Sequence, residues 1–265
     1  MQEFPQICEK AARAAGQVLL DWQGRITPKE KGSRDLVTEA DFASQAKIRE
    51  ILLGAFPSHD FLGEEDLPDS KLGNRSAEYR WVVDPLDGTQ NYVHRLQTFA
   101  VSIALQKRGE VVLGTVFDPV ANECYTAIKG QGAYLNGARL GTKNCLVAND
   151  AMVAVSFSPH VERDSVEFRR FVETTLACQS IRRLGSAALN LAYLAAGRLD
   201  AYFATSVKIW DIAAGVLLVS EAGGVISSIH GGPVDLENPR FLASATESLH
   251  GEMLEVLRKA EVSPQ

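Results

Sequence analysis

Apolar residues in the first quarter of the chain recur at intervals of three and four, the spacing of an amphipathic helix. They predict one helix over residues 4–22 and a second that begins after Thr38 and ends before Pro57. Between the two helices, residues 29–35 combine charged side chains with a glycine, which predicts an exposed loop. Thr38, followed three residues later by Asp41, is an N-cap pattern for the second helix.

From Trp81 onward the pattern changes to short apolar and β-branched runs, which predict strands. In the first half these runs lie at 81–83, 99–105, 110–117 and 124–128, and tight turns surround a further short strand within 130–137. After residue 145, strands and helices alternate. The strands are expected at 152–156, 179–182, 201–204, 224–227 and 241–243, and the helices at 166–177, 186–196, 212–221 and 249–259.

This order of elements predicts a layered α+β and α/β fold, an αβαβα sandwich with an antiparallel N-terminal sheet and a mixed C-terminal sheet. The change of pattern divides the chain into two halves, residues 1–145 and 146–265. No low-complexity linker separates the halves, so we expect them to pack tightly.

Composition and charge narrow the class of protein. The chain has 265 residues, 46% of them hydrophobic, and a net charge of −6 without a block of Lys and Arg, which argues against nucleic acid as the main ligand. Four scattered cysteines, without a CxxC pair, fit a reducing compartment better than a disulfide framework or a zinc site. No signal peptide is visible, and the longest apolar run, within 187–196, is too short to span a membrane. These features predict a cytoplasmic protein without a membrane partner.

The strongest chemical signal is the run Asp84–Thr89, which reads Asp-Pro-Leu-Asp-Gly-Thr and follows a buried strand that we expect to end at Asp84. Two carboxylates this close repel each other unless a cation lies between them, and Mg²⁺ prefers carboxylate and carbonyl oxygens. Gly88 and Thr89 offer backbone N–H groups where a helix can begin, which is a seat for phosphate. An ordinary turn uses the same residues, so the run alone leaves both interpretations open.

Two further acidic segments favour the metal site. Glu64 lies in the acidic loop Gly63–Glu65, and Asp211 stands where a strand-like run gives way to an apolar helix. Taken singly, Glu64 is explained by a solvated face and Asp211 by an N-cap. Their order and composition around Asp84–Thr89 are what indicate a functional site.

Together these segments resemble the inositol monophosphatase family of Mg²⁺-dependent, lithium-sensitive sugar phosphatases. The resemblance covers nearly the whole chain and is carried by residues 35–41, 63–65, 81–94, 130–137, 185–188 and 210–215. The combination of Trp81–Asn91 with the Trp210-Asp211 pair is highly specific, whereas either alone would only be suggestive. The family also implies a homodimer.

The resemblance implies a metal-binding role for five residues. Glu64 ligates one Mg²⁺ and orients the attacking water, and Asp84 bridges two metals. The backbone carbonyl of Leu86 contributes a ligand, while Asp87 and Asp211 hold the second metal. Two or three Mg²⁺ ions are therefore expected as cofactors. Water would attack the phosphorus in line, without a covalent phospho-enzyme.

The same resemblance implies a catalytic and substrate-binding set. Thr89 and Asp41 support the nucleophilic water, and the amides of Gly88 and Thr89 hold the phosphate. Residues 1–145 would thus bind metal and phosphate, and residues 146–265 would complete the substrate site. The substrate contacts expected from the second half are Gly185, Ser186, Ala187 and Asp211.

One position departs from the inositol-specific members of the family. They carry a glutamate seven residues before the acid that matches Asp211, where it hydrogen-bonds substrate hydroxyls, and here that position is Ala204. A site that hydrogen-bonds a hydroxyl discriminates far more strongly than an apolar one, so inositol specificity is left open. Ser206 or Lys208 could engage a leaving group with a second negative charge, although a strand that ends on a solvated lysine explains Lys208 equally simply.

Four other residues could lie near the metals or bind one. Lys31 stands where the family often has a lysine near the metals, although its charged neighbours favour a solvated loop position. His160, His230 and His250 show no metal-ligand spacing and are predicted to lie at the surface.

We therefore predict Mg²⁺-dependent hydrolysis of small phosphate monoesters, with phosphorylated polyols or sugars of the inositol-phosphate type as the leading substrates. Fructose-bisphosphatase, histidinol-phosphatase and nucleotide 3′-phosphatase activities are alternatives within the same chemistry. The alternative of a different class is a regulatory binding protein on the same fold, in contact with transcription or translation machinery.

Overall fold

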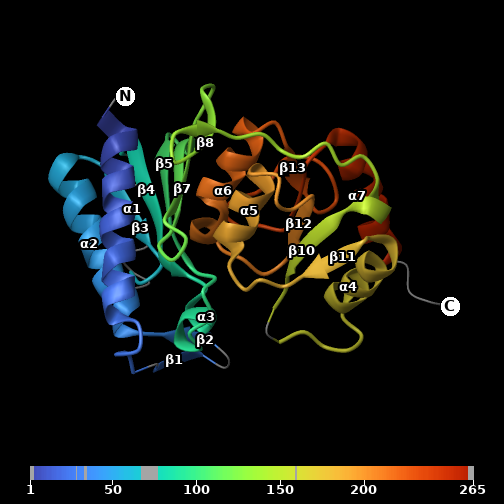
Figure 1. The fold of residues 1–265 in the computed structure, drawn as a ribbon, viewed down its shortest axis with the longest axis horizontal. Coiled ribbons are helices and arrows are strands. Elements are labelled where there is room, and N and C mark those ends of the chain that lie inside the picture. The colour runs from blue at the N-terminus through green and yellow to red at the C-terminus, as the bar shows by residue number, and fades with distance from the viewer. Residues whose placement is uncertain (1–2, 28, 33–34, 67–76, 159, 262–265) are drawn as a thin grey trace.

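A computed structural model describes residues 3–27, 29–32, 35–66, 77–158 and 160–261 of the chain. Helices and sheets alternate in it in five layers. The helices are α1 (Glu3–Trp22), α2 (Glu39–Ala55), α3 (Thr89–Val93), α4 (Val166–Ala177), α5 (Ala187–Ala195), α6 (Ile209–Glu221) and α7 (Glu247–Lys259). The pair α1 and α2 covers one sheet, α5 and α6 lie between the two sheets, and α4 and α7 cover the far side of the second sheet (Figure 1). The predicted αβαβα sandwich is confirmed.

The first sheet has seven strands in the order β3-β4-β5-β6-β7-β8-β9. All neighbours are antiparallel except β3 and β4, which run parallel. The predicted N-terminal sheet is thus antiparallel apart from this one pair. The strands are β3 (Asp60–Gly63), β4 (Tyr79–Asp87), β5 (Ala100–Lys107), β6 (Glu110–Asp118), β7 (Glu123–Ile128), β8 (Gly132–Leu135) and β9 (Ala138–Arg139).

The second sheet has five strands in the order β11-β10-β12-β14-β13. Strand β10 pairs in parallel with β11 and β12, whereas β14 pairs antiparallel with β12 and β13, so this sheet is mixed as predicted. The strands are β10 (Met152–Ser156), β11 (Ser180–Arg182), β12 (Ala201–Ala204), β13 (Val225–Ser228) and β14 (Phe241–Ser244).

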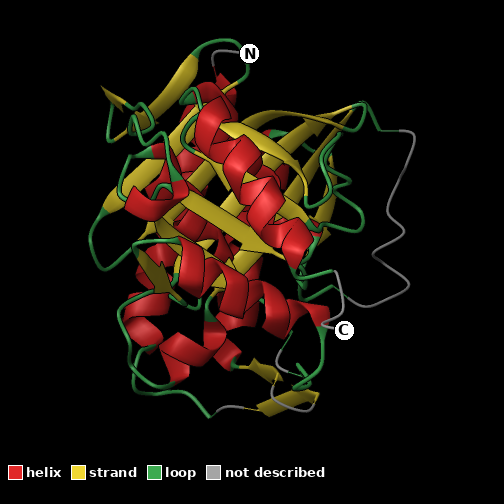
Figure 2. Cartoon of the chain, turned by 90° about the vertical axis from the view of Figure 1, so that its right-hand side faces the viewer, coloured by secondary structure: helices red, strands yellow, loops and turns green. Residues whose placement is uncertain are grey.

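Two predictions about individual segments are wrong. The charged stretch 29–35 was expected to form a loop, but β1 (Lys29–Gly32) and β2 (Asp35–Val37) pair antiparallel as a separate small sheet, at the lower edge of Figure 2. His250 was expected at the surface, but it is buried on α7, where its ring lies 2.9 Å from the Ser227 hydroxyl and 3.2 Å from the Ser244 hydroxyl. An amphipathic helix buries one face, and two serines satisfy the ring there.

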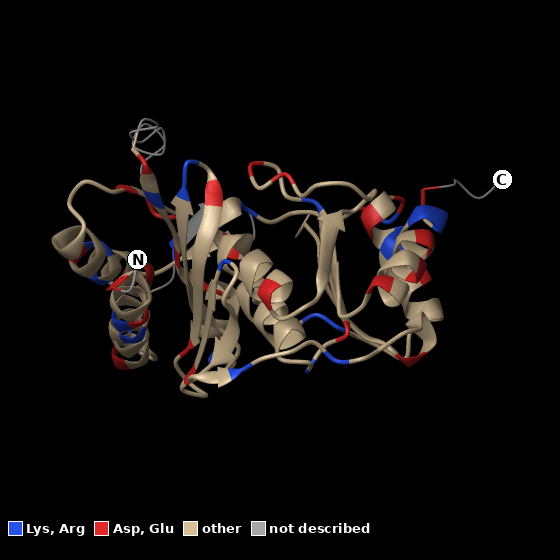
Figure 3. Ribbon diagram, turned by 90° about the horizontal axis from the view of Figure 1, so that it is seen from above, with Lys and Arg blue, Asp and Glu red and all other residues tan. Residues whose placement is uncertain are grey.

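The central helix layer is apolar on all its faces. Helix α5 contains no charged residue, and α6 contains only Asp211 and Glu221, whereas residues of both signs mark the outer helix beside the C-terminus (Figure 3). A helix between two sheets has no face toward water, so it needs no polar stripe. This explains the apolar run at 187–196. Across the described residues, no helix combines the length and apolarity needed to cross a membrane.

Helix α6 approaches its neighbours very closely. A Cβ on Gly114 of β6 would lie 2.7 Å from the backbone oxygen of Ala214, and a Cβ on Gly215 would lie 2.5 Å from the Cβ of Leu191 on α5. Two glycines therefore allow α6 to sit directly on the first sheet and on α5. Because Asp211 lies in the first turn of α6, this packing sets its distance from the acids of β4.

Candidate functional site

Strand β4 carries both acids of the central motif and continues to Asp87, past its predicted end at Asp84. Its register with β5 shifts between these two residues, which marks a bulge. A bulge tolerates a proline inside a strand because the hydrogen-bond ladder is already interrupted there. Two hydrogen bonds hold it: Asp84 Oδ1 accepts the Leu86 N–H at 2.9 Å, and the buried Ser44 hydroxyl donates to the Pro85 carbonyl at 2.8 Å.

Gly88 turns the chain from β4 into the short helix α3, with φ +95°. L side chains rarely adopt this conformation. A Cβ at this position would also lie 3.0 Å from the Thr98 carbonyl oxygen and 3.3 Å from that of Gly185. The position therefore requires glycine for its backbone angle and for the close approach of two other segments. The predicted helix start at Thr89 is confirmed.

Asp41 links the first turn of α2 to Thr89. Its Oδ2 accepts the Thr38 backbone N–H at 2.8 Å and the Thr38 hydroxyl at 2.7 Å, and Thr38 Oγ1 accepts the Ala40 N–H at 3.1 Å, which confirms the predicted cap. Its other oxygen, Oδ1, lies 3.2 Å from the Thr89 hydroxyl, which also lies 3.1 Å from the Leu86 carbonyl oxygen. The structure thus brings together the two residues predicted to support the water.

Asp87 is bound by the N-terminus of α5, about a hundred residues later in the chain. Its carboxylate accepts the Ser186 hydroxyl and the N–H groups of Ala187 at 3.1 Å and Ala188 at 2.8 Å. An acid is stabilised at a helix N-terminus because the first N–H groups have no partner within the helix. Ser186 is the N-cap of α5 and also accepts the Leu189 N–H at 3.2 Å.

Asp211 lies in the third position of α6, whereas the alternative interpretation of its sequence position placed it at the N-cap. The helix begins at Ile209, two residues earlier than Asp211, and Lys208 is the N-cap. The Asp211 carboxylate reaches back and accepts the Lys208 N–H at 2.7 Å. The sequence signal for a helix start was therefore right, but an acid at the third position can give the same signal.

Glu64 follows directly on β3 and extends its pairing with β4. The Glu64 N–H donates to the Val83 carbonyl at 3.0 Å, and the next N–H, that of Glu65, donates to the Gln45 side chain at 3.0 Å. A Cβ on Gly63 would collide with the same Gln45 side chain. Parallel pairing of β3 and β4 therefore brings Glu64 to the edge of the sheet where the acids of β4 lie.

These acids repel one another. Burial raises the pKa of Asp84 well above its usual range, and the charges of Glu64, Asp87 and Asp211 raise it further. Burial likewise raises the pKa of Asp211, with Asp87 and Glu64 as the next causes. Burial raises the pKa of Asp87 to about 6, although its hydrogen bonds to Ser186, Ala188 and Ala187 act in the opposite direction. The cluster favours protons or a cation.

The raised pKa of Asp87 makes a prediction for the metal-free protein. Native Asp87 holds its proton up to a pKa of about 6, whereas the usual pKa of an aspartate is 3.8. Its stabilising contribution is therefore fully present below pH 3.8 and is lost as the pH rises through about 6. In EDTA, we expect the thermal midpoint of the native protein, taken relative to Asp87→Asn, to fall from about pH 4 to about pH 7. A relative midpoint that rises over this interval in calorimetry would contradict the assignment.

The donor set fits a hard cation in its chemistry but not in its present orientation. Within the part of the chain that the structure describes, no three His, Cys, Asp or Glu side chains are placed to hold a metal ion as they stand. Oxygens of Asp84, Asp87 and Asp211 instead accept backbone N–H groups. The set nevertheless consists of carboxylate oxygens with raised pKa values, whose charges a Mg²⁺ ion would neutralise.

The residues predicted to meet the substrate lie in the second half. Gly185, with φ +82°, precedes the first turn of α5, so Ser186 and Ala187 lie beside Asp87. Ala204 ends β12 and is fully buried in the apolar core. Ser206 and Lys208 are exposed between β12 and α6. The side chain of Lys31 lies outside the described residues.

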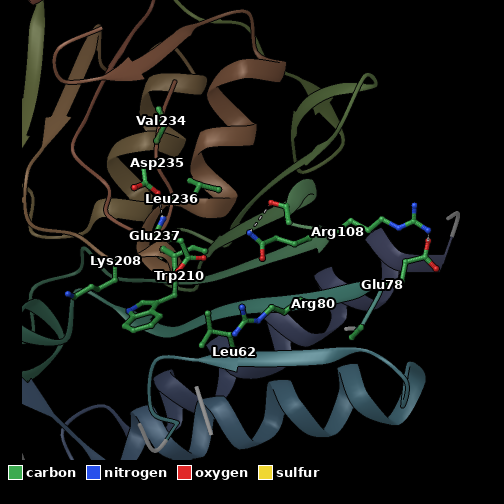
Figure 4. Close-up of a pocket in the computed structure, with 14 residues that line it drawn as sticks. Leu62, Glu78, Arg80, Arg108, Lys208, Trp210, Val234, Asp235, Leu236 and Glu237 are labelled. Carbon is green, nitrogen blue, oxygen red and sulfur yellow. Dashed lines mark hydrogen bonds and ion pairs between the residues drawn. The ribbon is translucent and has the colours of Figure 1, made fainter. Parts of the chain in front are cut away.

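A cavity of about 830 Å³ lies between the first sheet and the start of α6 (Figure 4). The described residues that line it include Lys208, a candidate contact to the leaving group, and Trp210, but none of those predicted to bind metal or phosphate. Arg80 of β4 projects into this space and pairs with Asp60 at 3.2 Å, and Arg108 pairs with Glu78 at 3.7 Å. No local sequence pattern indicates this cavity, because its walls come from five separate segments.

Comparison with known proteins gives matches over the whole chain. The model of the inositol monophosphatase family matches residues 1–261. The Nus factor SuhB of Escherichia coli K12 is 36% identical over 270 residues, covering 98% of this chain and 100% of that protein. An inositol-1-monophosphatase of Rhizobium meliloti is 42% identical over 212 residues, covering 78% of this chain and 77% of that protein. The crystal structure of the extragenic suppressor protein SuhB of Bartonella henselae has a TM-score of 0.90 at 33% identity, covering 96% of this chain and 98% of that one.

Proposed function

This chain belongs to the inositol monophosphatase family, and we propose that it hydrolyses small phosphate monoesters of polyols or sugars with Mg²⁺ at the carboxylate cluster. One observation carries the proposal. Asp84, Asp87 and Asp211 come from two halves of the chain, yet the charges of Asp87 and Asp211 both raise the pKa of Asp84, and the charge of Asp87 raises that of Asp211. A fold keeps such mutually repelling acids at little benefit to stability, so their concentration favours a functional site.

Five residues would hold the metal: Glu64, Asp84, Asp87 and Asp211 through carboxylates, and Leu86 through its carbonyl. Two or three bound Mg²⁺ ions would neutralise the charge of the phosphate and lower the pKa of a bound water. The charges of the carboxylates also explain why the metal-free cluster holds protons. Metal and proton should therefore compete for the same oxygens.

Thr89 and Asp41 are suited to orient the attacking water. Asp41 is held by two hydrogen bonds from Thr38, so its second oxygen is fixed toward the Thr89 hydroxyl. Glu64 would accept a proton of the water as the water oxygen bonds to phosphorus. The bond from phosphorus to the leaving oxygen breaks, and that oxygen takes a proton from water to leave as the alcohol. The N–H groups of Gly88 and Thr89 would bind the phosphate oxygens. Such pre-positioning supplies much of the rate enhancement in phosphoryl transfer.

Inositol phosphates lead the candidate substrates, and the Rhizobium meliloti relative carries the name inositol-1-monophosphatase. Ala204 is buried in the core and offers no hydrogen bond where inositol-specific members use a glutamate. The substrate-facing groups would instead be Gly185 and Ser186, which precede α5, and Ala187, its first residue. Fructose-bisphosphatase, histidinol-phosphatase and nucleotide 3′-phosphatase activities therefore remain alternatives.

Phosphate release from a panel of these substrates, in Mg²⁺ and in EDTA, tests the proposal. We expect Mg²⁺-dependent release from at least one polyol or sugar phosphate. Calorimetry in parallel measures Mg²⁺ binding. A protein that binds Mg²⁺ but hydrolyses no member of the panel would not be the proposed phosphatase.

Lithium inhibition is a further expected result, because sensitivity to Li⁺ is a property of the family. We expect Li⁺ to lower turnover at millimolar concentrations, with NaCl at equal ionic strength as the control. Turnover that stays constant across the lithium titration would remove this expectation without affecting the hydrolytic proposal.

A regulatory binding protein on the same fold is the second candidate, favoured by the name Nus factor of the Escherichia coli relative. The Asp84→Asn variant separates the two functions. Partner capture that survives in this variant while turnover is lost would show that binding does not require catalysis. Loss of both together would tie any binding to the intact site.

We also propose a homodimer. On α4 the side chains of Phe168, Val172 and Leu176 recur at every fourth residue and are 39%, 38% and 78% exposed. A continuous apolar stripe on an outer helix favours contact with another protein surface. Native mass spectrometry of the protein and of Leu176→Glu tests this, because a mass of one chain in the native protein would exclude the dimer.

A further inference from the structure

Asn91 lies on α3, four residues after Asp87, and joins the two halves of the chain. Its Nδ2 donates to the carbonyl oxygen of Thr98 and to that of Leu184, both at 2.7 Å. Thr98 follows α3 in the first half, whereas Leu184 belongs to the segment that enters α5. We call this pair of hydrogen bonds the Asn91 bridge.

The segment next to the bridge fits closely against α3. A Cβ on Gly185 would lie 2.8 Å from Asn91 Nδ2, and one on Gly88 would lie 3.3 Å from the Gly185 carbonyl oxygen. Gly185 also has φ +82°. Only a residue without a side chain permits this path, so the position of Leu184 relative to α3 is closely fixed.

The next residues after the bridge are the ones that bind Asp87. Ser186, Ala187 and Ala188 direct three donors at its carboxylate. Leu184, at which the bridge ends, thus lies two to four residues before these donors, and Asn91 itself lies four residues after Asp87. Both ends of the Asp87 contact are therefore set by the same side chain.

We propose that Asn91 is a positioning residue for the metal site: its amide fixes the start of α5, and α5 in turn orients the Asp87 carboxylate for the cation. The part that concerns the metal rests on the function proposed above. The part that concerns the start of α5 does not. Ser186, which we predicted as a substrate contact, would act here through Asp87, since its hydroxyl donates to Asp87 and accepts the Leu189 N–H.

Asparagine is the side chain that this position requires. Its amide nitrogen carries two hydrogens, one for each carbonyl oxygen. Aspartate has the same shape but presents a negatively charged acceptor to both carbonyls. Asn91→Asp therefore replaces both hydrogen bonds with repulsion and leaves the volume of the side chain unchanged. Asn149→Asp makes the same chemical change at an exposed position and is the matched control.

Hydrogen–deuterium exchange of the metal-free protein tests the first step. In Asn91→Asp we expect the amides of Ala187, Ala188 and Leu189 to exchange at least about ten times faster than in the native protein, while those of α7 are unchanged. Asn149→Asp should exchange like the native protein. Unchanged exchange at residues 187–189 would overturn the bridge, whether or not the protein proves to be a phosphatase.

Titration calorimetry with Mg²⁺ tests the second step. We expect Asn91→Asp and Ser186→Ala to weaken Mg²⁺ binding about 10- to 100-fold, the usual effect of losing a group that orients a metal ligand, and Ser186→Thr to restore it. Native affinity in Asn91→Asp would overturn the positioning role of Asn91, and native affinity in Ser186→Ala would overturn the step from α5 to Asp87. If Asn91→Asp unfolds, seen as fast exchange in α7 as well, Asn91→Ala, which removes both hydrogen bonds without adding a charge, decides the question by the same criterion. Absence of Mg²⁺ binding in the native protein would instead refute the proposed function.

Discussion

Asp84→Asn is expected to lower turnover by more than about a hundredfold, because even residues that only orient a metal ligand cost about 10- to 100-fold when replaced. Asp84 is 2% exposed and lies at the centre of the repelling acids, with Glu64, Asp87 and Asp211 each raising its pKa. Asparagine keeps the shape of the side chain, so the bulge of β4 should remain. Turnover of the best substrate at saturating Mg²⁺ is the measurement.

The same substitution should stabilise the metal-free protein. Removing one acid relieves the repulsion that the remaining acids experience at neutral pH. We therefore expect a higher thermal midpoint in EDTA and a smaller gain on adding Mg²⁺. Asp211→Asn should have the same two effects. Asp118→Asn is the control, because Asp118 is as buried as Asp84 but accepts hydrogen bonds from the turn after β6. Near-native turnover in Asp84→Asn or Asp211→Asn would overturn the metal assignment.

The features that could be predicted from the sequence are those with a local signal. Apolar periodicity located most of the helices and strands of both halves, although not β3 or β9, and the spacing of Thr38 and Asp41 located the start of α2. The acidic motifs indicated the candidate site residues, and the resemblance to the family assigned a role to each. Each of these signals lies within about ten residues of chain.

The features that could not be predicted depend on contacts between distant segments. Nothing near Asp87 in the sequence shows that residues 186–188 bind its carboxylate, and nothing near Asn91 shows that Leu184 accepts its amide. Asp211 gave a helix-start signal that fitted two positions. Strands β1 and β2 lack apolar alternation, so the charged composition of residues 29–35 indicated a loop, yet the backbones of the two strands pair.

Gly114→Ala is expected to lower the proposed turnover, although Gly114 has no side chain. The added Cβ would lie 2.7 Å from the Ala214 backbone oxygen and 2.8 Å from its Cα, and backbone atoms cannot rotate away as a side chain can. Helix α6 must then shift away from β6 or β6 must bend. Overpacking of this kind costs about 1–3 kcal/mol of stability.

The shift of α6 should reduce turnover more than the loss of stability alone explains. Asp211 lies one turn before Ala214, so moving α6 moves this acid relative to Asp84 and Asp87, and a displacement of about 1 Å can cost about a hundredfold in rate. Gly251→Ala is the matched control, because it makes the same change at an exposed position of α7 with no atom within 4 Å of the added Cβ. It should leave turnover unchanged and raise stability slightly, since alanine favours helices. Native turnover at saturating Mg²⁺ in a folded Gly114→Ala protein would show that the distance between α6 and the first sheet does not determine the geometry of the acids.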